Sequence, residues 1–350
     1  MDAGVRGEGN YARRSSGGLR SKLDASCIKL KMHRCVRGLG LVAAFALELA
    51  LLRGVSAHAD ATPIPHGTLE LIAEDQWIAA GRSFNLGLHF QLEKGWHIYW
   101  VNPGDSGEPP RVDWRLPMGV KAGAIEWPTP QRFQSSTIAD YGYEDAVLLM
   151  VPVSVDARLQ PQPSAEIEAE VKLLVCSHEM CIPGKAGLSL TLPMRRAQPA
   201  PETRNAGLFS VTRKSLPLPP PRTWRLSVAQ TGDSFVLTAN LGRLTASREI
   251  TGAIFFPLVE SQIENAAPQK LLSLATGFRL TLRKSDRLLK SPERLKGVLV
   301  VSSGSSQPDR AYSIDVAIKN PVPHKNPART TGSSSALGIR QRDNRCQYNP

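Results

Sequence analysis

The sequence contains little cysteine: five residues in a chain of 350. This content excludes a small scaffold that is held together mainly by disulfides. The sequence also lacks a Gly-x-Ser-x-Gly elbow, a His-Glu-x-x-His helix and a glycine-rich phosphate loop. These absences argue against an α/β hydrolase, a zinc peptidase and a nucleotide-binding enzyme.

The body of the chain also has little excess of positive over negative charge. The formal net charge is +12, but residues 1–59 and 324–350 together account for +10, and residues 60–323 for only +2. A near-neutral body offers no electrostatic footprint for a phosphate backbone, so we expect no nucleic-acid partner. The length and the 41% hydrophobic content exclude a wholly disordered chain and suit two domains.

Long hydrophobic runs are absent except near the N-terminus. Residues 39–52 form an apolar run of about 14 residues after a basic patch, shorter than the ~20 residues of a spanning helix. Ala57 and Ala59 then supply the small side chains that a signal peptidase requires. We expect residues 32–59 to be a signal peptide that is cleaved between Ala59 and Asp60. An uncleaved membrane anchor is the alternative.

This assignment has two consequences. Residues 1–31 are interpreted as an over-annotated N-terminus ahead of a true start at Met32, because a polar, arginine-containing segment is unusual before a secretion signal. The mature chain is expected to be soluble and to reside in the periplasm or otherwise outside the cytoplasm.

Residues 60–193 contain short strand-like runs separated by Gly, Pro and Asp clusters, without sustained helical periodicity. Alternate positions place Phe84, Leu86, Leu88 and Phe90 on one face, which is typical of a strand in a two-sheet sandwich. The pattern predicts an all-β, immunoglobulin-like sandwich. Its expected strands are residues 68–73, 83–92, 96–101, 121–127, 147–155, 167–175 and 188–192.

The composition changes after this domain. Residues 194–222 are rich in proline and are interpreted as an extended, semi-rigid linker, with a short helix expected within residues 202–215. Residues 223–320 predict a second, smaller β-sandwich, and residues 321–350 a disordered basic tail. The expected strands of the second domain are residues 223–228, 234–239, 252–259, 277–283, 297–302 and 311–318.

Cys176 and Cys181 are the two cysteines expected to pair. Cleavage removes Cys27 and Cys35, and Cys346 lies in the tail. Five extended steps would cover about 16 Å, whereas a disulfide requires Cα atoms about 4.4–6.8 Å apart, so the chain must turn between the two residues. The spacing therefore predicts a disulfide across the mouth of a hairpin, with Ser177 to Met180 in the turn.

The residues alone leave the chemistry of this pair open between a redox-active pair, a small structural disulfide and a metal site. A crosslink that closes so short a loop contributes little stability, whereas neighbouring cysteines suit thiol–disulfide exchange. His178, when protonated, would stabilise a thiolate and Glu179 would oppose it. A metal site of Cys176, His178 and Cys181 would lack a fourth ligand, so no cofactor is expected beyond the redox-active disulfide itself.

Four blocks of the sequence resemble a known family. They are Gly95-Trp-His-Ile-Tyr-Trp-Val-Asn-Pro-Gly-Asp-Ser-Gly-Glu-Pro-Pro110, Ile125-Glu-Trp-Pro-Thr-Pro130, Tyr141-Gly-Tyr143 and Val175-Cys-Ser-His-Glu-Met-Cys-Ile-Pro183. In order and composition they are similar to the N-terminal periplasmic domain of the thiol:disulfide interchange protein DsbD and its ScsB-like relatives. The second domain resembles the companion β-domain of the ScsB-like branch more loosely, through Phe255-Phe-Pro-Leu and Arg294-Leu-Lys-Gly-Val-Leu-Val300.

The resemblance implies that Cys176 and Cys181 are a redox pair that receives electrons and passes them to periplasmic thiol–disulfide oxidoreductases. It also implies a cap loop that shields the pair, and the matching position is occupied by Asp140, Tyr141, Tyr143 and Glu144. Without the resemblance, the same four residues suit an ordinary turn.

The electron donor is a further expectation. Full-length relatives continue into a multi-span membrane electron carrier and a thioredoxin-like domain, which this sequence does not contain. Three interpretations are open: a separate membrane protein reduces the chain, the gene is a truncated form of a longer one, or the fold has been kept for binding and not for electron transfer. The rival hypothesis is a non-enzymatic exported binding module with a structural disulfide, such as an accessory in copper handling.

Overall fold

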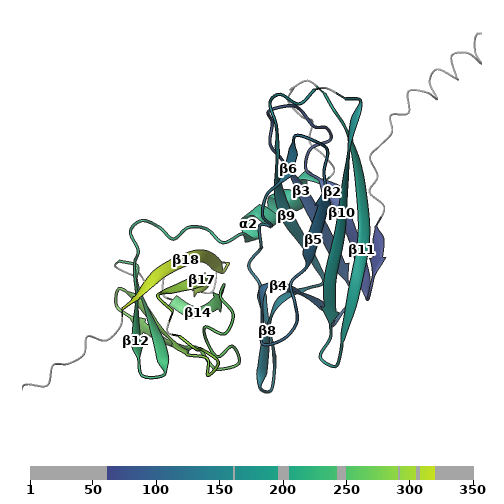
Figure 1. Cartoon of the computed structure of the whole chain (residues 1–350). Coiled ribbons are helices and arrows are strands. Elements are labelled where there is room, and N and C mark those ends of the chain that lie inside the picture. Colours follow the sequence, from purple (N-terminus) through teal and green to yellow (C-terminus); the bar gives the residue numbers. More distant parts are fainter. Residues whose placement is uncertain are drawn as a thin grey trace, which may run out of the picture. The chain divides into compact units, whose positions relative to one another are not determined.

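The computed structural model describes residues 61–160, 162–195, 205–242, 250–290, 292–304 and 308–319. These residues form strands β1–β18 and helix α2 (Figure 1), so the protein is all-β as expected. The N-terminal extension, the signal peptide with its cleavage site and the basic tail lie outside the described residues. Within the described ranges, no helix is both long enough and apolar enough to span a bilayer.

The first sheet of the first domain has the strand order β1-β2-β3-β9-β6 and is antiparallel throughout. The alternation predicted for β3 is confirmed, because Phe84, Leu86, Leu88 and Phe90 are all buried in one core. The strands are β1 (Thr62–Ile64), β2 (Gly67–Ala73), β3 (Phe84–Leu92), β6 (Val120–Ala122) and β9 (Ala146–Val155).

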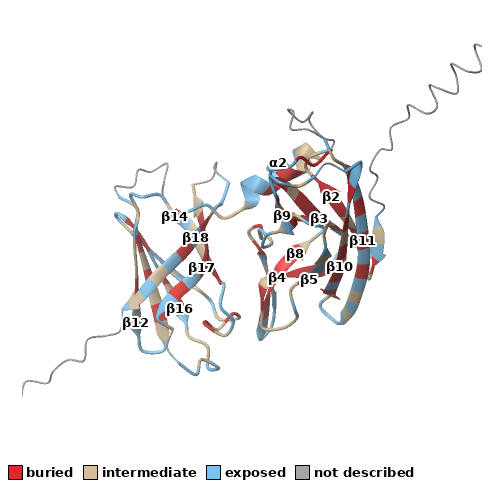
Figure 2. Cartoon of the chain, turned by 45° about the horizontal axis from the view of Figure 1, so that its top comes forward, coloured by how far each residue is buried: buried red, intermediate tan, exposed pale blue. Residues whose placement is uncertain are grey.

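The second sheet has the order β11-β10-β4-β8-β7, and β5 pairs with β10 beside this path. Its strands are β4 (His97–Gly104), β5 (Arg111–Arg115), β7 (Gln131–Ser135), β8 (Ile138–Glu144), β10 (Ser164–Cys176) and β11 (Cys181–Pro193). Side chains of both sheets meet in one hydrophobic core, which is the layered packing of an immunoglobulin-like sandwich. Figure 2 shows the resulting alternation of buried and exposed residues along β10 and β11.

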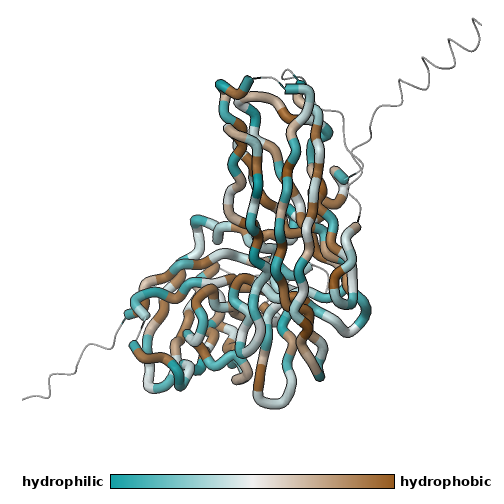
Figure 3. The backbone as a smooth tube through the Cα atoms, turned by 45° about the vertical axis from the view of Figure 1, so that its right-hand side comes forward, coloured by the Kyte–Doolittle hydropathy of each residue, from teal (hydrophilic) through white to brown (hydrophobic). Residues whose placement is uncertain are grey.

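The hairpin of β10 and β11 is the longest feature of this sheet. Both strands have 13 residues, and they stay in register from Ser164 opposite Pro193 to Cys176 opposite Cys181. In Figure 3 the long strands alternate between hydrophobic and hydrophilic positions, as expected for strands with one core face. The hairpin therefore brings the two cysteines together at its turn.

Five strands are not predicted from the sequence: β1, β5, β7 and β8 of the first domain, and β15 (Lys270–Leu274) of the second. The strand β7 is a polar edge strand, and β8 contains Asp140 and Gly142, which are residue types that are depleted in strands. The strands β5 and β8 pair with β10 and β4, which lie far away in the sequence, whereas β1 and β7 pair with their neighbours β2 and β8. Local composition therefore gave only a weak signal for these strands.

Helix α2 (Ala206–Ser215) changes the interpretation of the proline-rich linker. Its Phe209 is fully buried in a small cluster with Ile72, Leu148 and Met150 of the first domain. Beyond the helix, Leu218 exchanges backbone hydrogen bonds of 2.9 Å with the strand that contains Tyr312 in the second domain. The segment is thus attached to both domains, whereas the sequence analysis expects an extended spacer.

The second domain has the strand order β14-β17-β18-β12-β13-β16-β15. Two antiparallel halves are joined by the parallel pairing of β12 with β18, and they enclose a separate core that includes Phe235, Phe255 and Phe278. The strands are β12 (Arg225–Thr231), β13 (Ser234–Asn240), β14 (Ile250–Pro257), β15 (Lys270–Leu274), β16 (Gly277–Arg283), β17 (Arg294–Ser303) and β18 (Arg310–Lys319).

The two β-domains belong to one compact unit and share specific contacts. Phe256 of β14 packs edge-on against Trp100 and Tyr141 of the first domain, with ring centroids 6.4 Å and 5.2 Å apart. The buried Asn102 donates a hydrogen bond of 2.7 Å to the carbonyl oxygen of Pro257. The second domain therefore packs against the end of β4 and β8.

Candidate functional site

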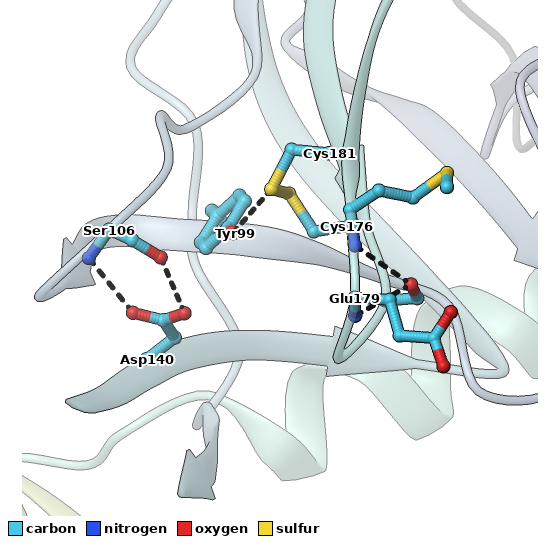
Figure 4. The surroundings of a disulfide bond; sticks show 8 residues. Tyr99, Ser106, Asp140, Cys176, Glu179 and Cys181 are labelled. Atoms are coloured by element: carbon cyan, nitrogen blue, oxygen red, sulfur yellow. Dashed lines mark hydrogen bonds between the residues drawn. A yellow bond between two sulfur atoms is a disulfide. The ribbon is translucent and has the colours of Figure 1, made fainter. Parts of the chain in front are cut away.

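The expected disulfide between Cys176 and Cys181 is present at the turn of the β10–β11 hairpin, with the two Cα atoms 4.1 Å apart. Ser177 closes the turn, because its backbone N–H donates a hydrogen bond of 2.8 Å to the carbonyl of Met180. The Ser177 hydroxyl also accepts hydrogen bonds from the N–H groups of Glu179 and Met180, at 3.2 Å and 3.3 Å. The four-residue loop predicted from the spacing is thus an ordered turn (Figure 4).

The two cysteines differ in their exposure to solvent. Cys176 is only 1% exposed, whereas Cys181 is an exposed residue. Cys181 is therefore the member of the pair that lies nearer to the surface.

Tyr99 lies directly against the accessible cysteine. Its hydroxyl oxygen is 3.7 Å from Sγ of Cys181, and the residue is fully buried (Figure 4). Burial raises the pKa of the Tyr99 hydroxyl, as does the nearby Asp140, while a hydrogen bond with Ser106 opposes the shift. The hydroxyl is consequently protonated at neutral pH and can donate a hydrogen bond to sulfur.

A short loop after β4 holds the Tyr99 ring in place. Gly107 lies flat against the ring, in a conformation with φ of +79°, and a Cβ atom there would overlap the ring. Ser106 donates two hydrogen bonds to Asp140, from its N–H at 2.9 Å and from its hydroxyl at 2.7 Å (Figure 4). Asp140 of β8 thus fixes the loop that covers Tyr99.

His97 lies beside the buried cysteine, since it pairs with Cys176 across β4 and β10. The imidazole stacks on Phe133 of β7 at 4.6 Å and meets Tyr99 edge-on at 5.2 Å. Burial, with a smaller contribution from His178, lowers the pKa of His97 to about 4. The imidazole is therefore neutral at neutral pH.

The structure corrects the expected cap. Tyr141 and Tyr143 lie in the hydrophobic core, together with Ile98 and Trp100. Tyr143 pairs with Ile98, and Cys176 pairs with His97, the preceding residue of β4. Strand alternation therefore directs the tyrosine rings and Cys176 to opposite faces of the sheet. Neither tyrosine ring covers the disulfide.

On the face of the disulfide, Tyr99 is the residue in contact with it, and Ser106, Gly107, Phe133 and Asp140 surround Tyr99 and His97. Of these, the sequence analysis named only Asp140. Tyr99, Ser106 and Gly107 all fall within the first block that carries the family resemblance. The signal that could have identified Tyr99 is its alternation with His97 on an expected strand.

The other residues predicted for the site lie in the hairpin turn and at the end of β8. His178 and Glu179 are exposed in the turn, and Glu144 is half-buried opposite His97. The weaker metal alternative has its two sulfur donors, Cys176 and Cys181, bonded to each other. Throughout the described part of the chain, no three His, Cys, Asp or Glu side chains are grouped so that they could hold a metal ion.

Fold and site together define a class: an immunoglobulin-like sandwich with an accessible disulfide at the turn of a hairpin. Residues 68–193 match the family model described as "Thiol:disulfide interchange protein DsbD, N-terminal". The chain therefore contains a DsbD N-terminal-like domain. A comparison with curated protein sequences found no match.

Solved structures extend this comparison. The N-terminal periplasmic domain of ScsB from Proteus mirabilis is similar with a TM-score of 0.53 and 17% identity, over 75% of this chain and 98% of that chain. At this identity the similarity concerns the fold, and its coverage extends beyond residues 68–193. The MSCRAMM ACE of Enterococcus faecalis matches with 9% identity over 76% of this chain and 96% of that chain, but its TM-score of 0.16 carries no argument.

Proposed function

We propose that this protein is an exported thiol–disulfide exchange protein that transfers electrons through Cys176 and Cys181. The observation that carries the proposal is the unequal exposure of the two cysteines within a DsbD N-terminal-like domain. A purely structural disulfide has no need of an accessible sulfur beside a buried one. Exchange needs one sulfur that a foreign thiolate can reach, because that sulfur is attacked while the other leaves.

Reduction of the disulfide proceeds in two displacements. A thiolate of a donor dithiol attacks Sγ of Cys181, the bond between the two cysteine sulfurs breaks, and Cys176 leaves as a thiolate that takes up a proton. The second thiolate of the donor then attacks the donor sulfur of the mixed disulfide and releases Cys181. The donor ends as a disulfide, and this domain has gained two electrons as a dithiol.

Transfer onward is the reverse sequence. The Cys181 thiolate attacks the disulfide of an acceptor protein and forms a mixed disulfide, and one acceptor sulfur leaves as a thiolate. Cys176 then loses its proton, attacks Cys181 and releases the reduced acceptor. We propose periplasmic thiol–disulfide oxidoreductases as acceptors and a separate membrane protein as donor.

The surrounding structure favours a role of this disulfide in thiol–disulfide exchange over a structural role. The hairpin of β10 and β11 is already held by 13 consecutive residue pairs, and the disulfide closes a loop of only four residues at its end. The loop entropy that a crosslink removes grows with loop length, so this disulfide adds less to the free energy of unfolding than one that closes a long loop. The bond is available for chemistry without loss of the fold.

The test compares the two cysteines in the full chain. We expect a reduction potential above about −300 mV after equilibration with glutathione buffers, since structural disulfides typically lie below this value. In Cys176→Ser, the Cys181 thiol should form a mixed disulfide with oxidised glutathione at least about tenfold faster than the Cys176 thiol does in Cys181→Ser, because thiolate access controls the rate. A potential below that limit, with equal rates in the two variants, would instead support the binding module.

A further inference from the structure

We propose that Asn265 of the second domain is a positioning residue for the redox pair: it fixes the loop that holds the Tyr99 hydroxyl against Cys181. The functional value of this contact rests on the proposed exchange function. The effect of Asn265 on the Tyr99 hydroxyl concerns only the pKa of the Cys181 thiol and can be measured without exchange. It gives the second domain a task that the sequence alone does not suggest.

Asn265 is almost completely buried, at 3% exposure, and its polar atoms contact the first domain. Its side-chain nitrogen donates a hydrogen bond of 2.8 Å to Oδ1 of Asp105, and its side-chain oxygen accepts one of 3.1 Å from the Tyr141 hydroxyl. Its backbone carbonyl accepts a hydrogen bond of 2.6 Å from Arg132. A carboxylate only accepts hydrogen bonds, so Asp105 dictates which side of the amide faces it.

Asp105 is the first residue of the loop that encloses the disulfide. Its Oδ2 accepts a hydrogen bond of 2.8 Å from the N–H of Ala139, while its own N–H donates one of 3.1 Å to the carbonyl of the same residue. Asn265 satisfies the other carboxylate oxygen. Asp105 is thereby held between β8 and the second domain.

The next two residues, Ser106 and Gly107, connect Asp105 to Tyr99. Ser106 donates two hydrogen bonds to Asp140, and Gly107 lies against the ring of Tyr99. The Tyr99 hydroxyl is 3.7 Å from Sγ of Cys181. An unbroken series of hydrogen bonds and packing contacts therefore connects Asn265 to Cys181. No step in it requires a change of conformation elsewhere.

The chemical consequence appears after reduction, when Cys181 becomes a thiol. A hydrogen bond from the Tyr99 hydroxyl favours the thiolate and lowers the pKa of Cys181. If Asp105 is no longer held by Asn265, the loop and the Tyr99 ring can move. The Cys181 thiolate then loses the Tyr99 hydroxyl as a hydrogen-bond donor. The charged and titratable groups around the loop and the disulfide are Asp105, Asp140, Arg132 and Tyr141, and His97, His178, Glu144 and Glu179.

The experiment measures alkylation of the reduced full chain by iodoacetamide against pH, with each cysteine followed as its own peptide by mass spectrometry. Asn265→Asp keeps the shape of the side chain but turns a donor toward Asp105 into a second carboxylate. We expect the midpoint for Cys181 to rise by about one pH unit, so that about tenfold less thiolate is present at neutral pH. Adding Asp105→Asn exchanges donor and acceptor and should restore the midpoint.

Two further variants separate positioning from general damage. Gln134→Ala removes another hydrogen bond between the domains, 3.2 Å to the carbonyl of Ala266, and should leave the midpoint unchanged. Tyr99→Phe should raise the midpoint as much as Asn265→Asp does, and the two changes together should raise it no further, because they act through one hydroxyl.

The proposal is overturned if Asn265→Asp unfolds cooperatively but titrates like the parent, or if it still shifts the midpoint when Tyr99→Phe is present. If Asn265→Asp does not fold, Tyr141→Phe decides, since it releases the amide oxygen of Asn265 and should raise the midpoint by a smaller amount. These readouts require no redox partner. A low reduction potential would therefore defeat the exchange function and leave this result standing.

Discussion

The strands β4 and β8 are buried on both faces, but against different partners. On one face Ile98, Trp100, Tyr141 and Tyr143 join the hydrophobic core. On the other face His97 and Tyr99 lie with Cys176 beneath Phe133 and the loop of Ser106 and Gly107. The first face is covered by packed side chains of sheets, and the second by one edge strand and one loop.

The two faces differ in how many contacts hold their side chains in place. Side chains of the core face are held by many neighbours, so a change there acts on the whole sandwich. The disulfide face is held by a few hydrogen bonds of a surface loop and one ring stack, so a change there acts first on the sulfur environment. Variants on the two faces should therefore separate stability from chemistry.

The largest expected effect is that of Tyr143→Ala on the core face. Its ring is buried and its hydroxyl donates a hydrogen bond of 2.7 Å to the carbonyl of Pro128. Removing a buried aromatic ring should lower the free energy of unfolding by about 3–5 kcal/mol. Urea denaturation measures this, and Tyr143→Phe, as the control, should lose only about 1 kcal/mol. A loss below 1 kcal/mol in the alanine variant would contradict the placement of this ring in the core.

The second effect concerns pH and His97 on the disulfide face. Burial, and to a lesser degree His178, lowers the pKa of His97 from 6.5 to about 4. Between these values the unfolded chain binds more protons than the folded chain. The contribution of His97 to the free energy of unfolding is therefore complete above pH 6.5 and is lost as the pH falls to about 4. The loss is about 3 kcal/mol at most.

His97→Phe provides the comparison, because it keeps a ring for stacking on Phe133 but does not titrate. Urea unfolding of both proteins at pH 7 and pH 4 should show a steeper loss for the parent chain. Asp140, whose pKa burial raises, contributes in the opposite direction, but it is present in both proteins and cancels in the difference. Parallel pH profiles for the two proteins would contradict a neutral, buried His97.

The sequence predicted the hairpin disulfide because the constraint is local: five residues cannot bridge without a turn. It also predicted β3, where four apolar residues alternate. It misplaced the cap because β8 was taken as a turn. Once Ile138–Glu144 is a strand, Tyr141 and Tyr143 must share one face, and Asp140 and Glu144 the other.

The rest of the site depends on contacts between distant segments. His97 reaches Cys176 only through the pairing of β4 with β10, and Asn265 reaches Asp105 across 160 residues of chain. No periodicity or local composition encodes such pairings. Register between distant strands is decided by tertiary packing, which the sequence of a single chain does not display.

Of these variants, Phe133→Ala is expected to have the smallest effect on the free energy of unfolding, and it tests the difference between the two faces directly. Phe133 is half-buried on an edge strand, so its removal should lower the free energy of unfolding by only about 1–2 kcal/mol. The same change uncovers the imidazole of His97, whose pKa should rise toward 6.5 because burial is the main cause of its low value. An NMR titration of His97 measures this shift, and Phe133→Leu, which retains most of the cover without the aromatic stack, should keep the pKa low. Dithiothreitol should also reduce the disulfide faster in Phe133→Ala at a denaturant concentration where the domain stays folded. If the pKa and the rate remain those of the parent while stability falls by as much as in Tyr143→Ala, then Phe133 belongs to the core and the two faces do not differ in the way described.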